Sequence, residues 1–288
     1  MFKAFLRNSA IAAATLTIGL LSAQAAQAGQ FHRGWNYSID AMTDGSGGSI
    51  FEIKGLAIKE TADDVFVSIS ANLPLAGTTS AHGADRNIGW GDLFFDFGGG
   101  TFNETNANSS LFAINFAAGS DSGAAQAGVY GGVSAKSVTL QNSGYSTLQQ
   151  YYAAGYGREN SFGTDFSSAE DVYGYYAGNT TGADTQIRNV IDSGTRLGSI
   201  SYLDGAAAAA QGLDFANFDA IGNEQITFRF DRTLLPSNAY IAHLLLECGN
   251  DGVAISGALA QDVPEPGAML GLVTLGLLAT RLRRKQTA

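Results

Sequence analysis

The sequence predicts a mainly β protein: an antiparallel β-sandwich of jelly-roll or lectin-like type with a few short helices. The 288-residue chain has 37 glycines and only 15% charged residues, which is typical of short strands joined by turns. Apolar residues recur at every second position in several segments, which is the period of a half-buried strand. Strands and helices do not alternate along the sequence, and this argues against a parallel sheet. A closed antiparallel barrel is the alternative architecture.

The clearest strand patterns lie in residues 65–71 and 226–231, where β-branched or aromatic side chains occupy alternate positions. Residues 51–54 and 56–59 predict two more strand segments on either side of Gly55, where we expect a β-bulge. Both tryptophans lie in apolar, strand-like segments and are expected in the core. Further strands are predicted over residues 87–97, 110–116, 127–133, 137–140, 198–203 and 239–247.

Helix signals are few. A serine and a glutamate at the ends of residues 167–170 fit a capping box, which predicts a short helix toward Tyr175. The amphipathic pattern of residues 184–192 predicts a second short helix. The alanine run at residues 206–210 lies between two glycines, so it predicts a loop or one or two helical turns.

The N-terminal residues 1–28 are typical of a secretory signal peptide. Two basic residues precede an apolar stretch, residues 10–21, which is too short to span a membrane. Small residues follow, and we expect signal peptidase to cleave between Ala28 and Gly29. This segment therefore predicts export through the Sec translocon.

The C-terminus carries three features in a fixed order. A short motif, Val263, Pro264, Glu265 and Pro266, precedes an apolar segment over residues 267–282, and the basic residues Arg281, Arg283, Arg284 and Lys285 close the chain. The apolar residues up to Thr280 would rise only about 21 Å as a helix, whereas a hydrocarbon core is about 30 Å thick. Leu282 and snorkelling arginine side chains could extend the segment. A buried C-terminal helix with a solvated basic end is the alternative.

This order resembles the PEP-CTERM sorting signal of exported bacterial proteins. The resemblance implies transient anchoring in the inner membrane, processing by an exosortase, and delivery to the cell surface or the extracellular matrix. The body of the chain is also similar to one family of exosortase-dependent surface proteins, and that similarity implies location and architecture but no chemistry. It lies in residues 35–40, 51–57, 88–97, 228–232 and 247–251.

These signals divide the chain into four parts. They are a signal peptide (1–28), a single β-sandwich ectodomain (29–255), a linker (256–262) and a sorting signal with its membrane segment (263–288). Six of the sixteen basic residues but only one of the 26 acidic residues lie in the two targeting segments. The remainder carries ten basic and 25 acidic residues, a net charge of −15. Because phosphate binding needs a basic surface, this charge excludes nucleic acid as an expected partner.

The single cysteine, Cys248, rules out an internal disulfide framework. Its apolar surroundings predict a buried small side chain. An intermolecular disulfide or a lipid attachment is the alternative.

Residue patterns for catalysis are missing from the sequence. The string at residues 119–123 has Asp121 at the centre, where the elbow of a serine hydrolase requires serine. We therefore expect no enzymatic activity and no required cofactor. A secreted glycosidase is a less favoured alternative, because no pattern selects a pair of carboxylates.

Calcium is the one metal that the sequence suggests. Asp40 and Asp44 lie beside a glycine-rich turn, and Asp251 lies in another acidic turn. Carboxylates on flexible loops suit Ca²⁺, which prefers hard oxygen ligands. Ordinary β-turns also favour aspartate, asparagine and glycine, so simple turn formation is the alternative.

A tyrosine cluster suggests a second function, that of a carbohydrate-binding module. Exposed rings can stack on sugars, and such binding would fit a protein delivered to an exopolysaccharide matrix. Packing of these rings against the sandwich is the alternative. The candidate residues are Tyr151, Tyr152, Tyr175 and Tyr176.

Overall fold

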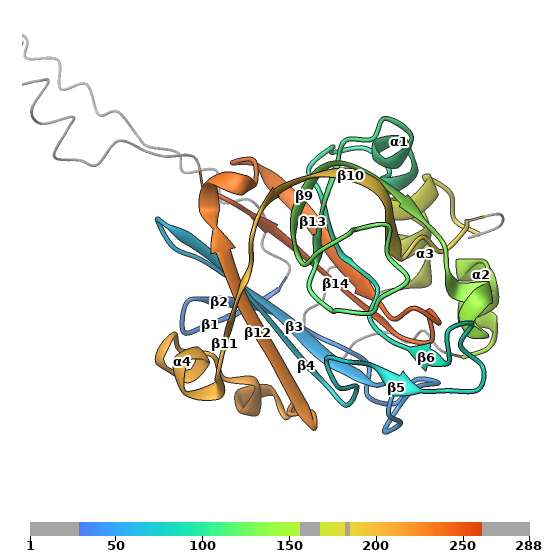
Figure 1. Ribbon diagram of the computed structural model, residues 1–288, viewed down its shortest axis with the longest axis horizontal. Coiled ribbons are helices and arrows are strands. Elements are labelled where there is room, and N and C mark those ends of the chain that lie inside the picture. The colour runs from blue at the N-terminus through green and yellow to red at the C-terminus, as the bar shows by residue number, and fades with distance from the viewer. Residues whose placement is uncertain (1–28, 156–167, 182–184, 261–288) are drawn as a thin grey trace, which may run out of the picture.

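Two antiparallel sheets of six strands each form the body of the protein (Figure 1). The computed structural model describes residues 29–155, 168–181 and 185–260. The first sheet has the order β1 (Gln30–His32), β2 (Trp35–Ile39), β3 (Ile53–Glu60), β4 (Asp64–Ala71), β12 (Glu224–Asp231) and β11 (Ser201–Leu203).

The second sheet has the order β10 (Val190–Gly198), β9 (Gly128–Lys136), β8 (Leu111–Asn115), β7 (Leu93–Asp96), β13 (Ala239–Leu245) and β14 (Gly252–Ala258). A separate two-stranded ribbon pairs β5 (Thr78–Thr79) with β6 (Asn87–Ile88). Neither six-stranded sheet closes into a barrel within the described ranges. The prediction of a mainly antiparallel β protein is therefore confirmed, whereas the jelly-roll or lectin-like type stays a prediction.

Short helices cover the outer faces of both sheets. The second sheet is covered by α1 (Phe102–Ala107), α2 (Leu148–Ala153) and α3 (Ala169–Ala177), and the first by α4 (Gly205–Ala210) and the 3₁₀ turn η2 (Phe215–Phe218). Two more 3₁₀ turns are η1 (Thr139–Asn142) and η3 (Arg232–Leu234). None of the helices in the described ranges is long and apolar enough to cross a membrane.

Three apolar clusters result from this layering. The largest lies between the sheets, and the others lie on the outer face of each sheet under its helices. Phe95 belongs to the cluster between the sheets and its neighbour Phe94 to the outer cluster under α1, because successive side chains of a strand point to opposite faces. For the same reason Phe66 faces outward while Val65 and Val67 face inward. Because helices cover the outer faces, several strands are buried on both sides, and apolar residues therefore do not strictly alternate with polar ones in their sequences.

Several local predictions are confirmed. The segments predicted at residues 51–54 and 56–59 belong to one strand, β3, which begins at Ile53, and its pairing with β4 shifts register between Ile53 and Gly55, where the bulge was expected. The alanine run forms the short helix α4. Both tryptophans and Cys248 are fully buried.

Other local predictions are wrong. Residues 137–140 do not form a strand, because residues 139–142 form η1. The helix expected at residues 184–192 is absent from the described part, residues 185–192, where Val190 begins β10. Its amphipathic spacing arises because Ile187, Val190 and Ile191 are buried in an extended segment.

Two boundaries also move. The helix α3 is capped by Ser168 with Asp171, one residue later than the expected pair. Ser256 belongs to β14, which extends to Ala258, so the first residues of the predicted linker (256–262) are part of the sheet. The signal peptide and the sorting signal, including the expected C-terminal helix, lie outside the described residues.

Candidate functional site

Three aspartates predicted as metal ligands meet at one end of the two sheets. Asp40 follows β2, Asp44 lies in the next turn, and Asp251 directly precedes β14. One carboxylate oxygen from each lies within 4.8 Å of the others. Asp40 and Asp251 are buried, and Asp44 is half-buried. The structure thus brings together residues that are more than 200 positions apart in sequence, and ion binding there stays a prediction.

Backbone N–H groups hold these carboxylates in place. Asp251 accepts hydrogen bonds from the N–H of Ile53 at 2.6 Å and from the N–H of Gly252 at 2.9 Å. Asp40 accepts the N–H of Ala41 at 2.8 Å. These bonds orient the oxygens, but an amide dipole does not supply a full positive charge.

Asp44 organises the turn that closes the cluster. It accepts hydrogen bonds from the N–H of Ser46 at 2.9 Å and from its hydroxyl at 3.2 Å. The same hydroxyl lies 3.2 Å from the carbonyl oxygen of Asn250, to which it donates. The loop between β2 and β3 is therefore tied to the turn between β13 and β14.

Glu52 adds a fourth carboxylate that the sequence analysis did not single out. Its side chain is 1% exposed, and Oε2 accepts the N–H of Gly48 at 3.2 Å. Its Oε1 has no hydrogen-bond partner in the described structure. A glutamate directly before an apolar strand was the signal available in the sequence, but strand ends often carry charges, so this signal is weak.

Crowding of the carboxylates changes their acidity. Burial, and then the charge of Asp44, raises the pKa of Asp40 to about 7, although its hydrogen bond with Asp251 acts in the opposite direction. Burial followed by the charges of Asp40 and Asp44 raises the pKa of Asp251 well above its usual range. Burial and the charge of Asp44 raise the pKa of Glu52 to about 6. The fold therefore concentrates negative charge where water cannot screen it.

The tyrosine cluster lies mainly inside the protein. Tyr151, Tyr175 and Tyr176 are 6%, 8% and 3% exposed, and Tyr152 is partly buried. The rings of Tyr175 and Tyr176 pack 5.2 Å apart, and Tyr176 packs 5.1 Å from Phe102. Sugar stacking needs an exposed ring face, so this structure corrects the expectation of an open tyrosine platform.

Tyr151 instead lies beside the acidic cluster. Burial raises its pKa well above the usual range, and the charges of Asp251, Asp40 and Asp44 add to that effect. Electrostatic effects of this kind fall off with distance. Tyr151, on α2, is therefore close enough to the carboxylates to feel their charge.

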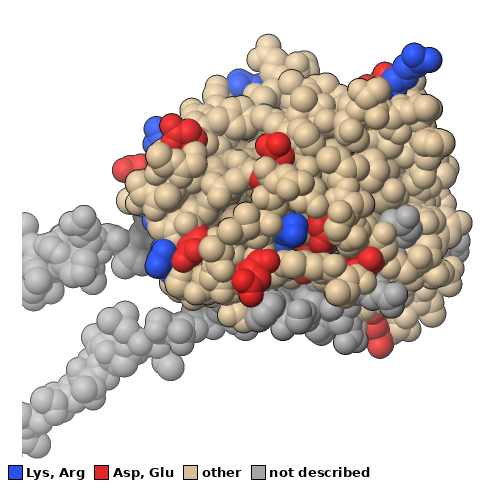
Figure 2. Space-filling view, turned by 90° about the horizontal axis from the view of Figure 1, so that it is seen from below, with Lys and Arg blue, Asp and Glu red and all other residues tan. Residues whose placement is uncertain are grey.

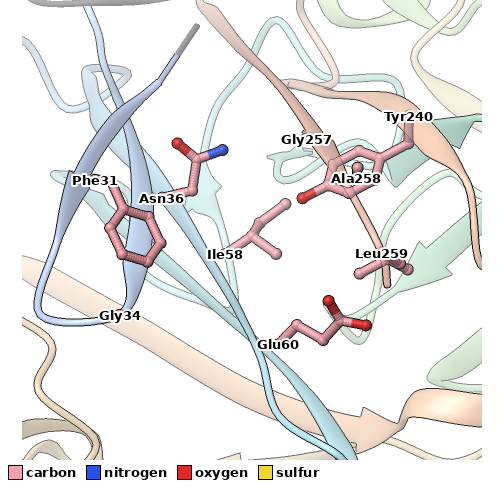
Figure 3. A pocket seen from close by; sticks show the side chains of 9 residues that line it. All are labelled: Phe31, Gly34, Asn36, Ile58, Glu60, Tyr240, Gly257, Ala258 and Leu259. Carbon is pink, nitrogen blue, oxygen red and sulfur yellow. The ribbon is translucent and has the colours of Figure 1, made fainter. Parts of the chain in front are cut away.

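A pocket of about 210 Å³ lies at the other end of β3. Figure 3 shows Phe31 and Asn36 on one side, Tyr240 and Leu259 on another, and Glu60 at the edge. Glu60 is already engaged, because Arg232 donates to it and the N–H of Ala260 lies 3.0 Å from both of its oxygens. Among the lining residues no second carboxylate is present to complete an acid–base pair.

Arg232 and Glu60 together hold the backbone of Ala260, the last residue that the structure describes, and we call this arrangement the clamp. Arg232 is buried, and it donates to the carbonyl oxygens of Ala260 at 2.7 Å and Leu235 at 3.0 Å. Glu60 holds the N–H of Ala260 at the same time. The fold is therefore anchored two residues before position 262.

The family comparison concerns the sequence that follows this clamp. Residues 262–285 match the family model for the PEP-CTERM protein-sorting motif. The chain carries a PEP-CTERM sorting motif. This motif implies export, exosortase-dependent processing and a cell-surface or extracellular destination. No curated protein and no solved structure matches the chain.

The surface charge of the folded domain agrees with the acidic composition of the chain. The face in Figure 2 carries isolated basic side chains among acidic ones, with no continuous basic patch. A nucleic-acid partner would need such a patch. This face therefore offers no support for nucleic-acid binding.

Proposed function

We propose that this is an exported surface or matrix protein without catalytic activity, whose tail directs sorting and is then removed. The observation that carries the proposal is the PEP-CTERM motif at residues 262–285. In this proposal the chain passes the Sec translocon and signal peptidase removes residues 1–28. The segment 267–282 then holds the protein transiently in the inner membrane. An exosortase cuts near Pro264–Pro266, and the folded domain reaches the surface.

The position of the clamp supports this order of events. The strand β14 ends at Ala258, and the contacts of Glu60 and Arg232 hold Ala260. Removal of the tail after the motif would take away none of the described packing. In this proposal the folded domain carries the function of the protein at the surface, and the tail serves only to direct sorting.

The state of the buried carboxylates supports a non-catalytic role. Glu247 accepts N–H groups from Gly89 and Asp121, each at 2.6 Å. Asp92 accepts the N–H of Ile191 at 2.6 Å and two side-chain donors. These oxygens satisfy backbone and side-chain donors inside the fold, whereas a general acid or base needs access to substrate.

A matrix destination makes exopolysaccharide the expected neighbour of the exported domain. Sugar binding through the tyrosine cluster does not form part of this proposal, because the rings of Tyr175 and Tyr176 are buried. A glycan array measured on the exported protein would reveal direct binding through another surface.

The decisive experiment is intact-mass measurement of the protein from the surface and membrane fractions of its bacterium, with and without an exosortase. We expect loss of the residues after roughly Pro266 only where the enzyme is present. A variant with Pro264, Glu265 and Pro266 changed to alanine should keep its tail, while the Gln286→Ala control should be processed normally. A full-length C-terminus in both strains would refute exosortase processing.

A further inference from the structure

We propose that Asp40, Asp44, Glu52 and Asp251 form a calcium site that joins the two sheets at one end of the fold. This inference goes beyond the proposed function, because sorting does not require a metal. It starts from the placement of the carboxylates. Asp40 and Glu52 flank the β2–β3 loop of the first sheet, and Asp251 lies at the start of β14 in the second.

The first step is geometric. One oxygen each from Asp40, Asp44 and Asp251 lies within 4.8 Å of the others. Two oxygens bound to the same Ca²⁺ at about 2.4 Å cannot be more than about 4.8 Å apart. The three aspartates therefore already have the spacing of a shared ion, without rearrangement of the backbone.

Glu52 gives an independent reason to expect a cation. Its side chain is 1% exposed, its Oε1 has no partner in the described structure, and its Oε2 is held over the glycine-rich turn by the N–H of Gly48. The charge of Asp44 acts on Glu52, and that of Glu52 acts on Asp40, so the fourth carboxylate is close enough to interact with the cluster, although it lies outside the three whose oxygens are within 4.8 Å of one another. A buried carboxylate oxygen without a donor is costly unless a cation or a proton reaches it.

The described residues do not provide that cation from a side chain. The structure gives no ion pair to Asp40, Glu52 or Asp251 in the ranges that it describes. Lys54 acts on Glu52 through its charge but makes no ion pair with it. Elsewhere the same fold places an arginine directly against a partly buried carboxylate, as it does for Glu60.

The chemistry of the ligands favours calcium over other metals. The site offers only carboxylate oxygens, which suit a hard ion, and no histidine or cysteine belongs to the cluster. Ca²⁺ accepts six to eight oxygens in flexible geometry, so four carboxylates leave room for water or carbonyl ligands. Mg²⁺ demands a small regular octahedron, which residues from two loops and two strand ends do not readily provide.

Protons are the competing occupants of the cluster. Asp40 and Asp251 are hydrogen-bonded to each other, which requires a proton between them when no ion is bound. A cluster that works with protons alone would not respond to Ca²⁺. The two interpretations are therefore separable by a metal titration.

The test is a titration of the exported protein, purified from its bacterium and stripped with EDTA, with CaCl₂ alone. Isothermal calorimetry should show one site, with a Kd between about 10⁻⁵ and 10⁻³ M, as in sensor or extracellular calcium sites. The melting temperature should rise with Ca²⁺ concentration, because an ion that binds only the folded state stabilises it. Terbium luminescence excited through tyrosine supplies a third readout, since Tyr151 lies beside the cluster.

Variants decide whether the response comes from these four residues. Asp251→Asn and Glu52→Gln should each raise the Kd for calcium at least tenfold, and Asp192→Asn, an exposed aspartate on β10, should leave it unchanged. If Asp251→Asn does not fold, Asp44→Asn in the half-buried turn gives the same test. No heat and no melting shift at 10 mM Ca²⁺ would overturn the proposal. So would an equal response to Mg²⁺, or wild-type affinity in the variants.

Discussion

The two ends of β3 bury acidic side chains in opposite ways. At the Glu60 end, Arg232 donates to the carboxylate and both residues hold Ala260. At the Ile53 end, the carboxylates of Asp40, Asp44 and Asp251 converge with Glu52 nearby, and no ion pair to Asp40, Glu52 or Asp251 exists among the described residues. Eight residues of strand separate the ends by about 25 Å. The Glu60 end thus contains its own counter-charge, whereas no described side chain forms an ion pair with Asp40, Glu52 or Asp251, whose charges a bound cation or protons would neutralise.

A third arrangement lies between these extremes. Among the described residues Glu247 has no ion-pair partner, but two N–H groups donate to it at 2.6 Å. Hydrogen bonds of this kind favour the ionised form, while burial opposes it. Comparing the three sites shows how a buried carboxylate is stabilised by a counter-charge at Glu60, by N–H donors at Glu247, and with few of either at the acidic cluster.

The largest effect should come from breaking the clamp. Arg232→Met leaves Glu60 and the carbonyl oxygen of Ala260 without their charged donor; removal of one partner from a buried ion pair costs about 3–5 kcal/mol, and the lower end applies because Glu60 is 24% exposed. Urea unfolding should show this loss at pH 7. A loss below about 1 kcal/mol would mean that the clamp contributes little and that the two ends do not differ as described.

The next effect is a pH dependence carried by Glu247. Burial raises its pKa from 4.5 to about 7, so between these values the unfolded chain has released a proton that the folded chain keeps. Stability should therefore fall as pH rises through this window, by about 3 kcal/mol. Glu247→Gln should remove that part of the slope in EDTA buffer, and the exposed Glu224→Gln should not. An unchanged slope in Glu247→Gln would show that the N–H donors fully offset burial.

Removing a charge from the acidic cluster should stabilise the protein, whereas removing a charge from the clamp should destabilise it. Without calcium at pH 8, Asp40→Asn removes one of several crowded negative charges and keeps an acceptor for the N–H of Ala41. We expect the free energy of unfolding to rise by about 1–2 kcal/mol, because like charges disfavour each other in a buried site. Calorimetric melting in EDTA checks this. Destabilisation would indicate that the cluster is stable without any cation, contrary to the comparison.

The smallest effect should come from an exposed pair. Arg229 donates to Asp64 at 2.6 Å, but its side chain is 49% exposed. Surface ion pairs contribute about 0–1 kcal/mol and weaken with salt. Arg229→Met measured beside Arg232→Met in 0.05 and 0.5 M NaCl should therefore show a small, salt-sensitive change. A loss as large as that of Arg232→Met would mean that burial does not govern these pairs.

Sequence reasoning captured the strands better than their surroundings. Residues 65–71 and 226–231 form neighbouring strands, β4 and β12, because alternate apolar residues determine which face is buried. The segment at residues 185–192 was misread because buried residues in an irregular extended stretch can imitate helical spacing. The end of β14 was misread because the small residues from Ser256 to Ala258 suit a linker as well as a tightly packed edge strand.

The candidate site could be predicted only in part. Turn chemistry indicated Asp40, Asp44 and Asp251, because aspartate beside glycine is visible in the sequence. Their convergence depends on β14 lying opposite β2 and β3, which is a tertiary fact. Arg232 could not be singled out for the same reason, since its partner Glu60 is remote in sequence. Burial of the tyrosines likewise follows from α2 and α3 packing on the second sheet.

The reactivity of Cys248 can report how often this part of the protein unfolds locally. This residue is fully buried in the turn that ends at Asp251, and burial raises its pKa to about 12. At pH 8 only about one thiol in 10⁴ would be the reactive thiolate, so a reagent in solution must wait for the turn to open. The rate at which a thiol dye labels this single cysteine is therefore a clock for local unfolding. Cys248 lies three residues before Asp251 of the acidic cluster, so a bound ion would slow the labelling of the cysteine.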